Sequence, residues 1–61
     1  MSYLTAKELS CFQDLLSGEE LLIKKFKMLA EATTDAELKA QFTDIANHHQ
    51  NHYDTIYSQL H

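Results

Sequence analysis

The chain has 61 residues, with nine acidic and five basic side chains and a formal net charge of −4. Proteins that follow a phosphate backbone carry a basic face, so this charge argues against a nucleic-acid-binding protein. The single cysteine, Cys11, cannot form an intramolecular disulfide, and it favours a reducing compartment. The N-terminus has no signal-peptide pattern and no apolar run reaches membrane-spanning length. We therefore expect a soluble cytoplasmic protein without a membrane partner.

The length of the chain limits the core that it can build. A domain of this size buries only roughly 60% of the surface that its unfolded chain exposes. Natural proteins below roughly 70 to 80 residues usually add disulfides, a metal or a partner chain. Since an internal disulfide is excluded, a metal and self-association are the two remaining sources of stability.

The first predicted element is a helix over about residues 5–32. The chain has no proline and one glycine, and it is rich in Leu, Ala, Glu, Lys and Gln, which favour helices. Thr5 followed by Glu8 is a capping-box pattern that opens this helix. Apolar residues then recur at helical spacing: Leu9, Phe12, Leu16, Ile23, Phe26 and Ala30.

The second predicted element is a helix over about residues 34–60. Thr34 followed by Glu37 is a second capping-box pattern, and Thr33 with Thr34 forms the predicted turn. The matching apolar stripe consists of Leu38, Phe42, Ile45, Ile56 and Leu60. The sequence thus predicts an all-α fold, an antiparallel two-helix hairpin that forms one domain over residues 1–61.

Polar residues interrupt both apolar stripes near the middle of the helices. The helical rhythm passes through Glu19 in the first helix, and through His49 and His52 in the second. Folding the hairpin about the predicted turn brings Glu19 level with His48, within one helical turn of the two stripe histidines. Residues three apart on a helix share a face, so we expect Glu19, His49 and His52 to meet. His48 falls on the flank.

These three residues are candidate metal ligands. Imidazole nitrogen and carboxylate oxygen suit zinc, iron, copper, nickel or manganese, and the residue types do not select among these metals. The alternative is a hydrogen-bonded polar cluster without a metal, because buried polar groups must be hydrogen-bonded in any case. Both interpretations stay open on the sequence alone.

A two-helix hairpin cannot cover both apolar stripes. Two copies packed together would form an antiparallel four-helix bundle with a shared core, so the main structural prediction is a homodimer. The polar cluster lies near mid-height, where a two-fold axis would bring both copies of it together. Gly18, in mid-helix beside Glu19, either permits close approach of a neighbour or is a surface position without a role.

The polar cluster resembles the metal site of ferritin-like proteins. These proteins use a Glu from one helix and a Glu-x-x-His motif from the next, repeated in a second helical pair, to bind two metal ions in a four-helix bundle. Glu19 matches the first position and His52 matches the motif histidine. His49 stands where the motif has glutamate. The resemblance implies a ferritin-like bundle with fewer carboxylates than that family uses.

The chain is also similar to the short coat F-type spore proteins, a ferritin-like group. The similar stretches are GEELLIKKF at residues 18–26, DAELK at 35–39, and DIA at 44–46 running into His52. This resemblance implies a structural or spore-coat-related role, association with the spore and other coat proteins as partners.

Two further functions are compatible with the sequence. A ferritin- or rubrerythrin-like metal-handling or redox enzyme would need carboxylate-rich ligation and an open coordination position, and the stripes supply few carboxylates. We therefore expect no enzymatic activity and assign no catalytic residue. The other alternative is a metal-free interaction module whose bundle surface binds another protein.

Overall fold

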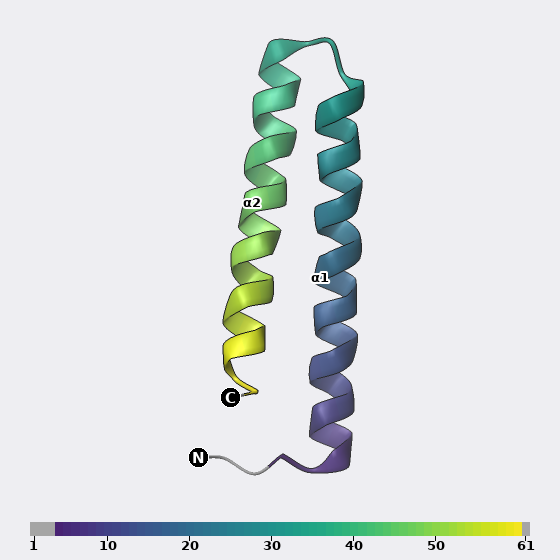
Figure 1. Ribbon diagram of the computed structural model, residues 1–61, viewed down its shortest axis with the longest axis vertical. Coiled ribbons are helices and arrows are strands. Elements are labelled where there is room, and N and C mark those ends of the chain that lie inside the picture. The colour runs from purple at the N-terminus through teal and green to yellow at the C-terminus, as the bar shows by residue number, and fades with distance from the viewer. Residues whose placement is uncertain (1–3, 61) are drawn as a thin grey trace.

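The computed structural model describes residues 4–60 and consists of two antiparallel helices joined by a short loop (Figure 1). Helix α1 spans Ala6–Ala32 and helix α2 spans Ala36–Ser58. The first turn of α1 and the last turn of α2 lie toward the same end of the hairpin, opposite the loop (Figure 1). Residues 4–60 contain no strand. The predicted all-α hairpin is therefore confirmed.

Helix α1 begins with the predicted capping box. The Thr5 hydroxyl accepts a hydrogen bond from the Glu8 backbone N–H, and a Glu8 carboxylate oxygen accepts one from the Thr5 backbone N–H, both at 3.1 Å. These two contacts satisfy donors that a helix N-terminus otherwise leaves unpaired. The hydrogen bonds from the Thr5 backbone and then from its side chain lower the pKa of Glu8 below its ordinary value.

Helix α2 begins two residues later than predicted, because its N-cap is Asp35. One Asp35 carboxylate oxygen accepts from the backbone N–H groups of Glu37 at 2.9 Å and Leu38 at 3.0 Å. The Thr33 hydroxyl in turn accepts from the Asp35 N–H at 3.2 Å. The predicted Thr34 capping box is wrong. A carboxylate brings full negative charge to the positive end of the helix dipole, which a threonine hydroxyl cannot supply.

Helix α2 also ends earlier than residue 60. The Gln59 N–H donates to the Ile56 carbonyl at 3.1 Å, and the Leu60 N–H donates to the Tyr57 carbonyl at 3.0 Å. These bonds span three residues instead of four, so the chain tightens into a terminal turn after Ser58.

The two helices meet along a seam of residues that recur every three or four positions. The seam residues of α1 that are buried or half-buried are Phe12, Leu16, Glu19, Ile23, Phe26 and Ala30. Those of α2 are Phe42, Ala46, His49, Tyr53 and Ile56, and Leu60 in the terminal turn continues the seam. The α2 stripe therefore passes through Ala46, which is 2% exposed, and the prediction that Ile45 lies on it is wrong. The small Ala46 side chain lets the helices approach closely.

A second stripe of large apolar side chains lies beside the seam. Successive helical residues are rotated by about 100°, so residues seven apart lie almost above one another. In an antiparallel pair, the positions about 100° before the seam on each helix fall on the same side of the hairpin. We call this side the apolar face, and it consists of Leu15, Leu22 and Leu29 on α1 with Leu38 and Ile45 on α2. All except the half-buried Leu22 are exposed, Leu15 at 55% and Leu38 at 42%. Among the described residues, neither helix is long and apolar enough to span a bilayer.

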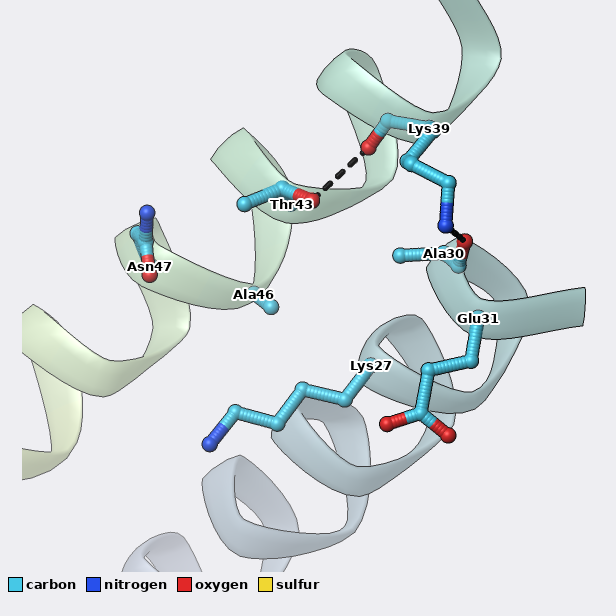
Figure 2. A pocket seen from close by; sticks show the side chains of 7 residues that line it. All are labelled: Lys27, Ala30, Glu31, Lys39, Thr43, Ala46 and Asn47. Atoms are coloured by element: carbon cyan, nitrogen blue, oxygen red, sulfur yellow. Dashed lines mark hydrogen bonds between the residues drawn. The ribbon is translucent and has the colours of Figure 1, made fainter. Parts of the chain in front are cut away.

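The opposite side of the hairpin is polar, and part of it is shown in Figure 2. There the Lys39 ammonium on α2 donates a 2.6 Å hydrogen bond to the Ala30 carbonyl, in the last turn of α1. Helix α1 has no basic residue in its own last turn, so Lys39 supplies positive charge to the negative end of its dipole. This contact links α1 and α2 near the loop.

The hairpin alone has little interior. Only Ile23, Ala30 and Ala46 are buried among residues 4–60. The chain exposes 4837 Å², several hundred Å² more than the roughly 4,000 Å² expected for a compact protein of this mass. Its radius of gyration is 14.5 Å, against roughly 10 to 11 Å for a compact chain of the same length. The surplus surface includes the apolar face.

We predict that Asp35→Ala lowers the free energy of unfolding by about 1 kcal/mol, because both α2 backbone donors lose their acceptor. Chemical denaturation followed by circular dichroism at one fixed protein concentration measures the change. Thr34→Ala is the matched control and should leave stability within about 0.5 kcal/mol of the original. A larger effect of Thr34→Ala than of Asp35→Ala would contradict the assignment of the cap.

Candidate metal centre

Glu19 and His49 meet across the seam at the middle of the hairpin. Glu19 is the central residue of α1, and its Oε2 lies 2.9 Å from Nδ1 of His49 on α2. Their side chains are 17% and 20% exposed, so the contact is shielded from solvent on most sides. Because an ionised carboxylate only accepts hydrogen bonds, Nδ1 of His49 carries the hydrogen in this contact. In the neutral ring, Nε2 then keeps the free lone pair.

An aromatic cluster holds the His49 ring from the loop side of the seam. The rings of His49 and Phe26 are stacked, with centroids 6.1 Å apart and planes inclined by 17°. Phe26 also packs against Phe42, again with a centroid distance of 6.1 Å. The imidazole is therefore fixed by Glu19 at one nitrogen and by Phe26 on one ring face. Such fixation lowers the ordering cost of binding a ligand at this position.

His52 completes the group from the edge of the seam. Its Nδ1 lies 3.8 Å from the same Glu19 oxygen that contacts His49, and its side chain is 50% exposed. The prediction that His52 lies on the seam itself is wrong. The helical rhythm continues from His49 to Tyr53, which leaves His52 about 60° away, toward the apolar face. At that position it occupies the place that a third α2 apolar residue would take, seven residues after Ile45.

His48, which the sequence places on the flank of the helix, is exposed and lies close to another histidine. Its ring centroid lies 4.3 Å from that of His52, closer than the 6.1 Å that separates it from His49. The sequence did contain the signal for this contact, because residues four apart on a helix are neighbours. The position of His48 away from the seam nevertheless favoured leaving it out of the predicted ligand set.

The structure brings the three predicted ligands, Glu19, His49 and His52, together. One donor atom from each lies within 4.8 Å of the others. An ion with bonds of about 2.0 to 2.1 Å and tetrahedral geometry separates its ligands by roughly 3.3 Å. The 2.9 and 3.8 Å distances from Glu19 Oε2 to the two histidines lie on either side of this separation. Three protein ligands leave a fourth position for water or another group.

Glu19 can serve such a site in two ways. As a ligand it contributes the single negative charge of the group, which would partly compensate a divalent ion. As a hydrogen-bond acceptor it fixes the tautomer of His49 and presents Nε2 to the ion, a common arrangement in metal centres. Both roles use the same Oε2 atom, and both require the carboxylate to be ionised.

Comparison of the chain with models of known families, with characterised proteins and with solved structures finds no match. The ferritin-like and coat F-type resemblance, with the spore-related role that it implies, therefore stays a prediction from the sequence. The geometry of the three side chains carries the functional argument.

We predict that Glu19 and His49 are energetically coupled in the metal-free protein. Glu19→Leu or His49→Leu alone leaves a half-buried polar group without its partner and should lower stability by about 1 kcal/mol. The double variant removes both polar groups from an apolar seam and should be more stable than either single variant. Urea denaturation in the presence of a chelator, at one protein concentration, gives the double-mutant cycle. Additive losses would contradict the coupling.

Proposed function

We propose that this protein binds a transition-metal ion through Glu19, His49 and His52. The observation that carries the proposal is the convergence of these donors from both helices, with Glu19 and His49 in the middle of the seam and His52 at its edge. Glu19 and His49 are shielded from water on most sides, and the loss of hydration of their polar groups costs free energy. A bound ion would offset that cost, because metal binding to a folded site stabilises the fold.

The donor set favours a single ion of the zinc, copper, nickel, iron or manganese group. Two neutral imidazoles and one carboxylate leave a divalent ion with one uncompensated positive charge. A pair of divalent ions would be compensated far less well by the same groups. Imidazole-rich ligation suits zinc, copper and nickel, whereas magnesium and calcium prefer oxygen ligands.

We further propose that the protein works as a homodimer, in which a second copy covers the apolar face. The surplus exposed area of several hundred Å² is comparable with the roughly 800 Å² per partner of a stable interface. The five side chains that make up this face are leucines and an isoleucine, and none of them is charged. Burying the face therefore places few unpaired charges in the interface, and two hairpins would form a four-helix bundle.

Self-association would also bring two metal centres near one another. A two-fold axis that crosses the face at the middle of the hairpin would place the middle of one copy against the middle of the other. Glu19 is the central residue of α1, so the two copies of Glu19 would lie near this axis. The cluster opens at the edge of the apolar face through the half-exposed His52, so the partner would lie beside this opening. Gly18, beside Glu19, has no atom within 4 Å of the position of a Cβ, which leaves room for a close approach there.

A ferritin- or rubrerythrin-like metal-handling or redox enzyme is a weaker proposal for this site. Ferritin-like di-metal centres use four carboxylates and two histidines, whereas two copies of this chain would supply two Glu19 carboxylates. The centre has too little negative charge for two divalent ions.

A metal-free interaction module is the second candidate, and one specific observation favours it. The 2.9 Å contact between Glu19 and His49 already satisfies both groups, and residues 4–60 contain no buried side-chain polar atom without a partner. In that case the polar group would fix the register of the helices and the apolar face would bind a protein.

We predict that protein purified without an affinity tag binds about one zinc or copper ion per chain at pH 7.5. Loss of a residue that only hydrogen-bonds to a metal ligand weakens metal affinity roughly 10–100-fold. His49 is proposed as a ligand itself, so His49→Ala should weaken metal binding by at least about 100-fold. Binding should also weaken as the pH falls, because protons compete for the imidazole nitrogens. Competition titration with a chromophoric chelator measures each affinity.

Glu20→Gln is the matched control for the metal experiment. Glu20 is an exposed neighbour of the site that lies 3.5 Å from Lys24, and its removal should leave metal affinity unchanged. Absence of binding after incubation with zinc, copper, nickel, iron and manganese in turn would refute the metal proposal and favour the interaction module.

We predict that the protein sediments as a dimer at micromolar concentration and that Leu15→Glu shifts it toward monomer. Leu15 is 55% exposed, so the substitution places a charge in the proposed interface while disturbing the hairpin little. Leu21→Glu is the matched control, because Leu21 is 69% exposed on the side of α1 away from the apolar face. A folded monomer at these concentrations, or equal effects of both substitutions, would refute the dimer.

A further inference from the structure

The ring pair of His48 and His52 is the strongest feature that the proposed centre leaves unexplained. Both side chains are exposed on α2, and their ring centroids are 4.3 Å apart, the shortest of the histidine ring distances. Two neutral imidazoles on a solvated surface gain little from each other. A metal ion bound between them would add an interaction that the two rings alone do not supply.

The spacing of the pair is a chelating one. Two histidines four residues apart on one helix project from the same face, and this spacing is used to bind zinc in helical metal sites. Both side chains are open to solvent, and imidazole ligands favour copper, nickel and zinc. The helix backbone fixes the distance between the two rings, so little order has to be created when an ion binds.

His52 belongs to this pair and to the inner cluster at once. Its Nδ1 is 3.8 Å from Glu19 Oε2, and its ring touches that of His48 on the solvent side. His49 is on the inner side, with 20% of its side chain exposed, whereas half of the His52 side chain is exposed. The four residues thus form a short path from solvent to the seam, with His52 in the middle.

We propose that His48 and His52 form a capture position for a divalent transition-metal ion, which passes from there to Glu19 and His49. The transfer part rests on the proposed function of the inner centre. During transfer His52 stays bound, His48 leaves the ion, and the inner groups replace it and bound water. No electron moves, and the charge of the ion is unchanged. The Glu19 carboxylate draws the divalent ion inward, since the outer pair offers only neutral ligands.

The equilibrium test isolates the outer pair by disabling the inner centre. In a Glu19→Gln, His49→Ala background, copper titrated into the protein should bind to two imidazole nitrogens, visible in the electron paramagnetic resonance spectrum. Adding His48→Ala should weaken this binding by about tenfold or more, a loss of about 1.4 kcal/mol. His61→Ala in the same background is the control and should change nothing. Unchanged copper binding after His48→Ala would overturn the proposal.

The kinetic test addresses the transfer with the original chain and zinc. A stopped-flow experiment follows zinc leaving a weak chromophoric chelator for the protein. His48→Ala should slow loading by about tenfold while leaving the final affinity within about twofold of the original. An unchanged loading rate would overturn the capture role. A large loss of final affinity would overturn it as well, because His48 would then be a permanent ligand.

The two proposals fail in distinguishable ways. If the original chain and its His48→Ala variant both bind no zinc or copper, the inner centre is absent. If copper binds only while His48 is present, the surface pair is the sole metal position and the transfer is refuted. Alanine is the best helix former, so His48→Ala should keep α2 intact, which circular dichroism verifies.

Discussion

Two helices can cover only one stripe of each other's surface, and this constraint shapes the whole molecule. The stripe in this hairpin is a seam of small and aromatic side chains in which only Ile23, Ala30 and Ala46 are buried. Hydrophobic burial in such a seam offsets little of the conformational entropy lost by ordering the chain. A partner chain or a bound ion would add stability that the seam does not supply. The apolar face and the polar cluster are the two places where the hairpin could bind them.

The two sides of the hairpin differ in the residues that they expose. On the polar side, Lys39 caps the C-terminal end of α1 and charged residues face solvent. On the apolar side, leucines at seven-residue spacing continue from the seam, and the open edge of the polar cluster lies among them. A partner and a metal ion would therefore act at the same surface. A partner on that surface would reduce the water around a bound ion and would strengthen the electrostatic interaction of the ion with Glu19.

Much of this arrangement follows from the sequence. The Thr5 capping box, the two helices and the meeting of Glu19 with His49 are all consequences of local patterns and of folding the chain about its turn. The helical spacing of apolar residues did not place His52 correctly. The stripe is several residues wide, and spacing alone does not identify the residues at its centre. Ala46 displaced Ile45 from the seam because close helix contact favours the smaller side chain. Thr34 and Asp35 are both residue types that cap helix N-termini, and a capping-box pattern alone does not show which of them is the N-cap of α2.

The sequence predicts a homodimer and three candidate metal ligands, but it does not show which ion would bind or what covers the apolar face. The pattern of leucines is the same for any apolar occupant. The structure adds that one oxygen of Glu19, Oε2, lies near two histidines that differ in exposure. A sequence shows that three donors converge, but only coordinates show which of them faces solvent.

The position of the cluster has a consequence for how the chain can vary in length. Glu19 and His49 lie on different helices, and the loop at residues 33–35 is the only covalent connection between them. An extra residue in that loop can bulge outward and leave both helices in phase. An extra residue inside α2 before His49 would rotate every later side chain by about 100°. The histidines would then leave the carboxylate, so changes in length are tolerated at the loop and excluded from the helical arms.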